Sequence, residues 1–265
     1  MSPAVLTIIG LALIFVCTAL GSAFVYVFKG KEISANINQI FLGFAAGIML
    51  SASIFSLIIP AINGSTETSI PSWIIVGLSV LLGAAFIWGI DKLVPHLHSN
   101  NQEEGLKTQK INKTSKMFLA VTIHNVPEGL AVGIAYGIGL ASITTSNNVL
   151  LGALMLAIGI GIQNIPEGAV VSLLFKGDGR SNNQAFAFGA LSGAVEPVAG
   201  LIGLALAFSI QAIMPWALAF AAGCMLYVIA EEMIPDIKSN SINHRGVWAF
   251  MIGFILMMIL DVALG

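Results

Sequence analysis

Long apolar segments separated by short polar breaks run through the whole chain. Each segment is about as long as the roughly 20 residues that an α-helix needs to cross a bilayer. The breaks between them fall where polar residues, Gly, Pro or Lys cluster. The pattern predicts eight membrane-spanning helices at about residues 4–28, 36–62, 72–95, 117–142, 149–175, 185–210, 214–237 and 246–264.

The composition favours helices in lipid over the other fold classes. Apolar residues make up 57% of the 265 residues and charged residues only 9%, whereas a soluble chain carries roughly 25% charge. A transmembrane β-barrel would show segments of ~10 residues in which polar and apolar positions alternate. Stretches such as 185–191 and 251–260 do not alternate. We therefore expect an all-α polytopic membrane protein with a single transmembrane domain over residues 1–265.

The basic residues indicate how the spans are oriented. On the predicted topology all 11 Lys and Arg lie on one side of the membrane, and the opposite loops hold Glu67 and no base. By the positive-inside rule the basic side is cytoplasmic. We expect a multi-pass protein of the cell membrane, plasma or inner, with both termini outside the cytoplasm. The polar segment 96–116 is then a flexible cytoplasmic loop.

The overall charge narrows the choice of partners. The net charge is −2 and no basic stripe is present, so nothing indicates nucleic acid as a partner.

The lipid bilayer is the surrounding medium, and small-residue stretches such as 43–47 and 189–193 permit close packing of helices. Such stretches also permit a homodimer without requiring one.

Two neighbouring spans carry matching hexapeptides near mid-span. Span 4 contains His-Asn-Val-Pro-Glu-Gly at residues 124–129, and span 5 contains Gln-Asn-Ile-Pro-Glu-Gly at residues 163–168. Because neighbouring spans run in opposite directions, a pseudo-two-fold axis in the membrane plane relates the two copies. The sequence therefore predicts inverted pseudo-symmetry about the span 4/span 5 pair. Inverted repeats of this kind recur at the substrate sites of transporters.

The spacing within each hexapeptide gathers metal-binding groups on one side of the helix. Residues four apart share a helical face, and two pairs have this spacing: His124 with Glu128, and Gln163 with Glu167. The amides of Asn125 and Asn164 lie one turn before the same glutamates and slightly to the side. Each motif proline lacks an N–H, so one backbone carbonyl in each helix loses its helical partner.

The cost of burying acidic side chains argues that these residues are functional. One acidic group at the bilayer centre costs roughly 2.5–3.5 kcal/mol on insertion scales. Together Glu128, Glu167 and Glu196, the last in span 6, would cost on the order of 8 kcal/mol. Packing alone gives no reason for that cost, whereas a cation passing between the carboxylates does.

The charges and donor types indicate a divalent metal. Two carboxylates neutralise one divalent ion when His124 is neutral and Gln163 offers its carbonyl oxygen. Mixed nitrogen and oxygen ligation suits Zn²⁺, Fe²⁺, Mn²⁺ or Cd²⁺ better than Mg²⁺ or Ca²⁺. A second ion could use Asn125, Asn164 and Glu196, with the two motif glutamates bridging. Three carboxylates would then face four positive charges, so we expect this second site to be weaker.

Two function classes other than transport are compatible with acidic residues in a membrane span: a hydrolase and a scaffold. An intramembrane zinc-dependent hydrolase would use Glu128 or Glu167 as general base. Such enzymes carry His-Glu-x-x-His, and the chain has no such string. A membrane scaffold is also conceivable, but nothing in the sequence requires it. We therefore expect a transporter and no enzyme, with the metal as transported substrate and not as a catalytic cofactor.

At these residues the sequence resembles the ZIP family of zinc and iron transporters, and specifically its GufA-like prokaryotic branch. The resemblance covers the whole chain, through the eight spans, the polar loop between spans 3 and 4, and the paired Asn-x-Pro-Glu-Gly motifs. The strings at 192–197 and 225–235 are also similar to this branch. The resemblance implies import of divalent metal into the cytoplasm through a binuclear centre at mid-membrane.

The resemblance also assigns residues to three groups. The primary site would consist of His124, Glu128, Gln163 and Glu167, with Met49 of span 2 as an additional candidate ligand. The secondary site would consist of Asn125, Asn164 and Glu196, sharing the two motif glutamates. A cytoplasmic exit cluster would consist of Asp91, His96, His98, Glu231 and Glu232.

Two positions depart from the better-known branches of the family. Position 163 is Gln where many members carry His, and position 164 is Asn where many carry Asp. Both differences remove basicity or charge from the centre, so the metal preference and the occupancy of the second site are open. The family further implies that spans 1, 4, 5 and 6 slide as a bundle against spans 2, 3, 7 and 8.

Overall fold

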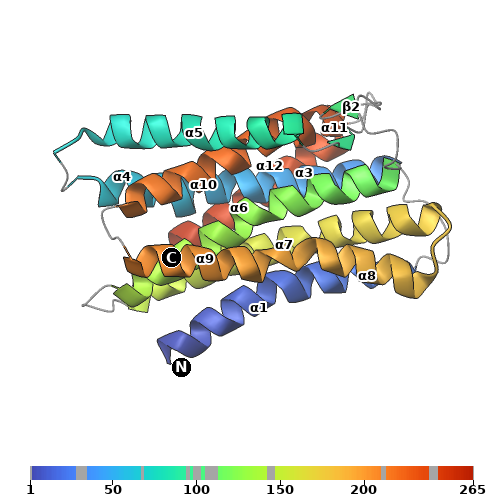
Figure 1. The fold of residues 1–265 in the computed structure, drawn as a ribbon, viewed down its shortest axis with the longest axis horizontal. Helices are drawn as coiled ribbons and strands as arrows, with labels where there is room; N and C mark the ends of the chain where they lie inside the picture. Colours follow the sequence, from blue (N-terminus) through green and yellow to red (C-terminus); the bar gives the residue numbers. More distant parts are fainter. Residues whose placement is uncertain are drawn as a thin grey trace.

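The computed structural model describes residues 2–27, 35–66, 69–93, 96–97, 103–104, 113–141, 147–209, 213–238 and 244–264. Within these ranges the chain forms a bundle of helices that lie side by side along one long axis (Figure 1). Eight segments are long and apolar enough to cross a membrane: Pro3–Val27, Asn36–Gly64, Ser72–Lys92, Phe118–Leu140, Val149–Gly177, Asn182–Ala207, Met214–Met233 and Arg245–Ala263. The expectation of an all-α, eight-span membrane protein is confirmed.

Several spans are built from more than one helical piece. Spans 1 to 4 contain α1 (Pro3–Ser22), α2 (Phe24–Val27), α3 (Ala35–Ala52), the π-helical turn η1 (Ser53–Ile58), α4 (Ile59–Gly64), α5 (Ser72–Leu93) and α6 (Lys113–Ala141). Spans 5 to 8 contain α7 (Asn147–Gly177), α8 (Asn182–Gly193), α9 (Val195–Ser209), α10 (Met214–Val228), the π-helical turn η3 (Ile229–Met233), α11 (Ile234–Lys238) and α12 (Arg245–Leu264). Between α5 and α6, the short strands β1 (His96–Leu97) and β2 (Glu103–Glu104) pair antiparallel.

A proline explains the break in span 6. The sequence predicts one continuous helix here, but α8 ends at Gly193 and α9 begins at Val195. Pro197 has no N–H to donate to the carbonyl of Gly193, four residues earlier, so the helix is interrupted beside it. The interruption places Glu196 in the first turn of α9, where free backbone N–H groups favour a negative charge.

Spans 2 and 7 share a local structure that supports the inverted repeat. Each contains Phe-Ala-Ala-Gly, at 44–47 and 220–223, followed by a π-helical turn that ends two residues before a proline. The N–H of Ile59 donates to Ile54, and that of Ile234 to Ile229, each five residues back. Such π-turns are rare and occur often at functional sites.

The packing of the spans repeats in the same way. The most extensive contacts are those of α1 with α7, α6 with α9, α3 with α12 and α10 with α5. In the inverted repeat, spans 1, 2, 3 and 4 correspond to spans 6, 7, 8 and 5. Under this correspondence the contact of α1 with α7 becomes that of α9 with α6, and the contact of α3 with α12 becomes that of α10 with α5. Glycines allow the close approach: a Cβ at Gly47 would meet the carbonyl of Phe250, and one at the equivalent Gly223 would meet that of Val80.

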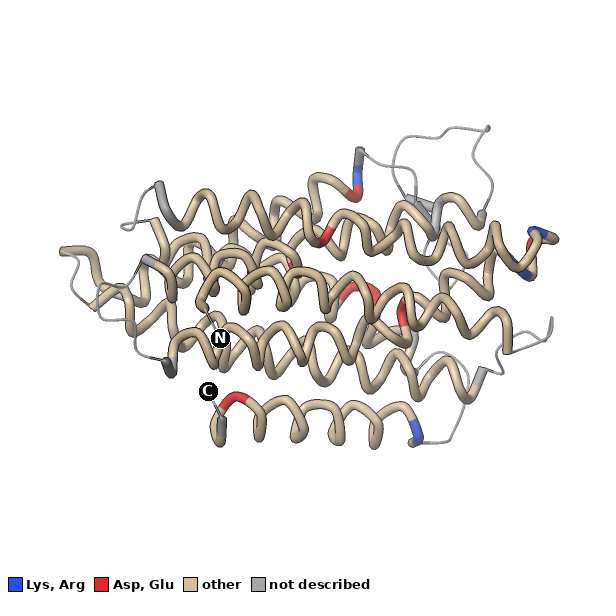
Figure 2. Tube along the Cα trace, turned by 90° about the horizontal axis from the view of Figure 1, so that it is seen from below, with Lys and Arg blue, Asp and Glu red and all other residues tan. Residues whose placement is uncertain are grey.

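The charged residues are distributed unevenly along the bundle. Both termini lie at one end, and the Lys and Arg drawn in Figure 2 lie at the other end or toward it. Acidic positions, in contrast, also occur within the length of the bundle. The apolar exterior is that of a protein in lipid, with exposed side chains such as Trp73, Leu81 and Val198.

Candidate metal site

The polar residues of the two hexapeptides lie in the interior of the bundle. Helices α6 and α7 both continue through their motif prolines, Pro127 and Pro166, and carry the motifs side by side. The side chains of five motif or partner residues are fully buried: Asn125, Glu128, Gln163, Asn164 and Glu196. Burying this many polar groups without partners would cost several kcal/mol each in a hydrocarbon layer. Their partners therefore decide what the site can do.

A hydrogen bond joins the two motifs at the centre. Gln163 Nε2 donates to Glu128 Oε1 over 2.6 Å. This contact links the first residue of the span 5 motif to the glutamate of the span 4 motif. The carboxylates of Glu128 and Glu167 are close enough to repel each other electrostatically, and both also interact with Glu196. The three acidic residues that the sequence singled out thus influence one another electrostatically, but among the described residues their ligand atoms do not all lie within 4.8 Å of one another.

Glu196 is held by hydrogen bonds from two other helices. Its Oε1 accepts from Thr18 Oγ1 of α1 at 3.1 Å, and its Oε2 accepts from Asn164 Nδ2 of α7 at 2.7 Å. The remaining motif amide, Asn125 Nδ2, donates to the backbone carbonyl of Ser192 at 3.0 Å. Asn164 and Glu196 are therefore neighbours, as the predicted secondary site requires, while Asn125 turns its N–H group toward α8.

Several buried oxygens in this region have no hydrogen-bond donor among the described residues. They are Glu128 Oε2, Gln163 Oε1, Asn125 Oδ1 and Asn164 Oδ1. An acceptor left without a donor in a dry interior is unfavourable, but it is the group that a metal ion binds. The donor set of carboxylate and amide oxygens therefore fits a hard or borderline divalent cation.

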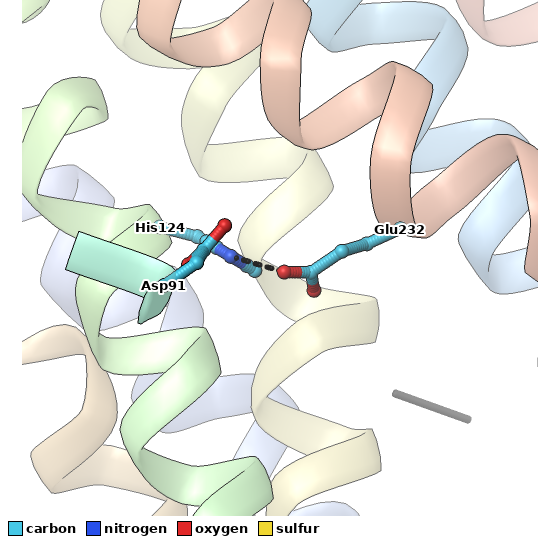
Figure 3. Close-up of side chains that lie close together, drawn as sticks. All are labelled: Asp91, His124 and Glu232. Carbon is cyan, nitrogen blue, oxygen red and sulfur yellow. Dashed lines mark ion pairs between the residues drawn. The ribbon is translucent and has the colours of Figure 1, made fainter. Parts of the chain in front are cut away.

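His124 lies beside two residues of the predicted exit cluster (Figure 3). Its Nε2 is 2.9 Å from Glu232 Oε1, and ligand atoms of Asp91, His124 and Glu232 all lie within 4.8 Å of one another. His124 also interacts electrostatically with Glu167. The imidazole that the sequence assigned to the primary site thus contacts Glu232, a residue predicted for the exit cluster, and is linked to the motif glutamates only through its electrostatic interaction with Glu167.

The other predicted site residues are distributed differently. Glu231 is exposed, whereas its neighbour Glu232, the partner of His124, is partly buried. His96 lies in β1, where only the backbone is described, and His98 lies outside the described residues. Met49 is buried in the apolar core at 1% exposure, a position compatible with either packing or ligation.

Sequence reasoning missed the partners that hold the acidic groups. Thr18 was one polar residue in an apolar span, and only the contact between α1 and α9 reveals that it donates to Glu196. Asp261 of α12 likewise accepts a hydrogen bond of 2.6 Å from Ser56 in η1. The Phe-Ala-Ala-Gly string at 44–47 is a signal in the sequence for the face of span 2 that meets span 8, because its glycine lies against the carbonyl of Phe250.

Comparison with known proteins identifies the family. A family model described as the ZIP zinc transporter matches residues 4–118 and 114–261. The chain belongs to the ZIP family. The match covers nearly all of both halves of the inverted repeat, so the resemblance drawn from the paired motifs is confirmed.

Relatives from bacteria and animals cover almost the full chain. Zinc transporter GufA of Myxococcus xanthus is 37% identical over 252 residues, covering 94% of this chain and 95% of that protein. Zinc transporter ZIPB of Bordetella bronchiseptica is 33% identical, covering 97% and 81%. Zinc transporter ZIP11 of Homo sapiens is 33% identical, covering 94% of both.

Membership of the ZIP family decides between the function classes. The protein is a multi-pass membrane transporter of divalent metal ions, with zinc as transported substrate and not as catalytic cofactor. The family is one of transporters and its relatives here are named as such, so the expectation that the protein is no enzyme is confirmed. The hydrolase alternative receives no support.

Proposed function

We propose that this protein imports Zn²⁺ into the cytoplasm through a mid-membrane site, and that Fe²⁺, Mn²⁺ and Cd²⁺ compete for the same route. Glu128 and Glu167 supply the charge, Gln163 an amide oxygen and His124 a nitrogen. The single observation that carries this is the burial of Glu128 beside Gln163 and Glu167, with acceptor oxygens directed into the interior. Met49 would be the soft ligand that favours zinc over harder ions.

The position of His124 suggests how the ion leaves the centre. His124 is one helical turn from Glu128 on α6 and 2.9 Å from Glu232, so an ion can change ligands one at a time. Asp91 and Glu232 would receive it next, followed by His96 and His98 at the cytoplasmic end. Stepwise exchange keeps the ion coordinated, which avoids the large cost of an isolated charge in the membrane interior.

We further propose that both termini lie outside the cytoplasm of a cell-membrane protein. The clustering of Lys and Arg toward the end opposite the termini supports this orientation by the positive-inside rule. Labelling single cysteines at Ser2 and Asp178, in a Cys17→Ser, Cys224→Ser background, with a membrane-impermeant reagent tests it. Outside labelling should reach position 2 and not position 178, and the reverse pattern would contradict the orientation.

Movement of one group of helices against another would expose the site first to one side of the membrane and then to the other. One group would consist of α1, α6, α7, α8 and α9, and it would slide against a second group that consists of α3, α5, α10 and α12. A homodimer, if formed, would fix the second group and leave the first free to move. Crosslinking in native membranes, followed by determination of the mass of the crosslinked product, tests whether the protein forms a dimer.

Metal uptake into proteoliposomes tests the proposed function. The parent protein should take up ⁶⁵Zn²⁺, while Glu128→Gln and Glu167→Gln should reduce uptake by at least 10-fold, since each removes one of two charge-neutralising ligands. Asp178→Asn, at an exposed turn, is the matched control and should transport as the parent does. Parental uptake by both glutamate variants would refute the site.

A further inference from the structure

Both carboxylate oxygens of Glu196 already accept hydrogen bonds from within the protein. Asn164 Nδ2 lies 2.7 Å from Oε2, and Thr18 Oγ1 lies 3.1 Å from Oε1. The Thr18 hydroxyl shares its proton with the carbonyl of Ile14, at 3.2 Å. Glu196 itself is fully buried. Each carboxylate oxygen of Glu196 thus already has a hydrogen-bond donor, from α1 or from α7, with which a second metal ion would have to compete.

The surroundings fix the orientation of the Asn164 amide. Its Nδ2 faces two acceptors, Glu196 Oε2 and the carbonyl of Ile14 at 3.4 Å, while its Oδ1 has no donor among the described residues. Turning the amide over would place Oδ1 against a carboxylate and a carbonyl oxygen. An N–H group, which cannot ligate a metal, therefore points at Glu196.

The charge of the site leads to the same conclusion. With Asn at position 164, the carboxylates of Glu128, Glu167 and Glu196 carry three negative charges, so two divalent ions would leave an excess positive charge in a buried site. Asp at this position would supply a fourth carboxylate and balance two ions. A net charge buried away from water is costly, so the asparagine disfavours the second ion.

We propose that the central site binds one divalent ion at a time, and that Asn164 sets this stoichiometry by giving Glu196 an N–H group in place of a second metal. Glu196 is then a positioning residue: it ties α1, α7 and α9 together behind the ion site. This proposal rests on the proposed function, and it replaces the two-ion centre expected from the family resemblance with a one-ion centre.

Zinc stoichiometry, measured as differences between variants, tests the proposal. Purified protein is equilibrated with Zn²⁺ and the bound metal is counted by elemental analysis. Any zinc held by the group of Asp91, His124 and Glu232 is present in the parent and in every variant, so it does not affect the difference between their counts. Glu196→Gln should bind as many ions as the parent, while Asn164→Asp should bind one more. The double variant Asn164→Asp, Glu196→Gln should lose the added ion.

Two further readouts separate the possible failures. X-ray absorption should show a zinc–zinc distance of about 3.5–4 Å, the spacing of two-metal sites, in Asn164→Asp and not in the parent. Loss of one ion in Glu196→Gln, or no gain in Asn164→Asp, would overturn the proposal and leave the proposed function standing. Glu128→Gln should lose the central ion in either case, and if it does not, the proposed function fails instead.

Folding of the variants is checked independently by thermal unfolding. If Glu196→Gln does not fold, the comparison of Asn164→Asp with the parent still decides, because it changes one atom type and keeps the side-chain volume. Thr18→Val provides a second probe, since it removes a donor to Glu196 and adds no charge. It should leave the count at the parental value, and a gain of one ion in Thr18→Val would show that Asn164 does not set the stoichiometry.

Discussion

Gln163 Nε2 lies 2.6 Å from Glu128 Oε1, so the first residue of one motif donates a hydrogen bond to the glutamate of the other. The contact joins two antiparallel helices in the interior of the protein and leaves Gln163 Oε1 without a donor among the described residues. In the proposed site, a single side chain would thereby orient one metal ligand and offer a second.

We expect Gln163→Leu to raise the zinc concentration needed for half-maximal uptake by about 10-fold or more, the usual effect of losing an orienting partner. Gln163→His should be much milder, because imidazole can donate to Glu128 through one nitrogen and bind metal through the other. Uptake over a series of zinc concentrations in proteoliposomes measures both. Equal effects of the two substitutions would argue against the bridging role.

Glu232 and its neighbour Glu231 should differ in their effect on transport. Glu232 pairs with His124, whereas Glu231 is exposed. Glu232→Gln should lower the maximal uptake rate several-fold by slowing the passage of the ion away from His124, and Glu231→Gln should leave it near the parental value. Initial rates at saturating zinc measure the difference. A larger loss in Glu231→Gln would show that the exit path uses Glu231 and not the pair of Glu232 and His124.

The hydrogen bond between Ser56 and Asp261 should stabilise the packing of span 2 against span 8. It is 2.6 Å long and partly buried, and hydrogen bonds to charged groups contribute roughly 1.5–3 kcal/mol. Ser56→Ala should therefore lower the unfolding temperature in detergent. Ser79→Ala is the control, because the Ser79 hydroxyl is buried without a partner among the described residues and its removal should be neutral or stabilising.

Two glycines in α5 give a matched test of helix packing. A Cβ at Gly83 would meet the carbonyl of Phe220 in α10, whereas one at Gly77 would meet nothing within 4 Å. Gly83→Ala should destabilise the protein by about 1–3 kcal/mol through overpacking, while Gly77→Ala should be neutral or stabilise by up to about 1 kcal/mol through helix propensity. Thermal unfolding of the two variants measures both, and similar stabilities would contradict the close contact.

The sequence by itself determined the fold class and named the candidate residues of the centre. Apolar segments of membrane-spanning length can form little else than helices in lipid, because every backbone N–H and C=O must be paired within the segment. Acidic residues in such segments are costly enough to require a partner. Glu128, Glu167 and Glu196 could therefore be named as candidate site residues from the chain alone, and their common role as metal ligands stays a prediction.

Only the tertiary structure decided which atoms of those residues are available to a metal. Thr18 and Asn164 donate hydrogen bonds to Glu196, and His124 lies within reach of Glu232 and Asp91. These partners come from helices far apart in the sequence, and helical periodicity states only which face a residue occupies. Which faces meet is set by close contacts such as those of Gly47 and Gly223, because small differences in packing distance decide the rotation of each helix against its neighbour.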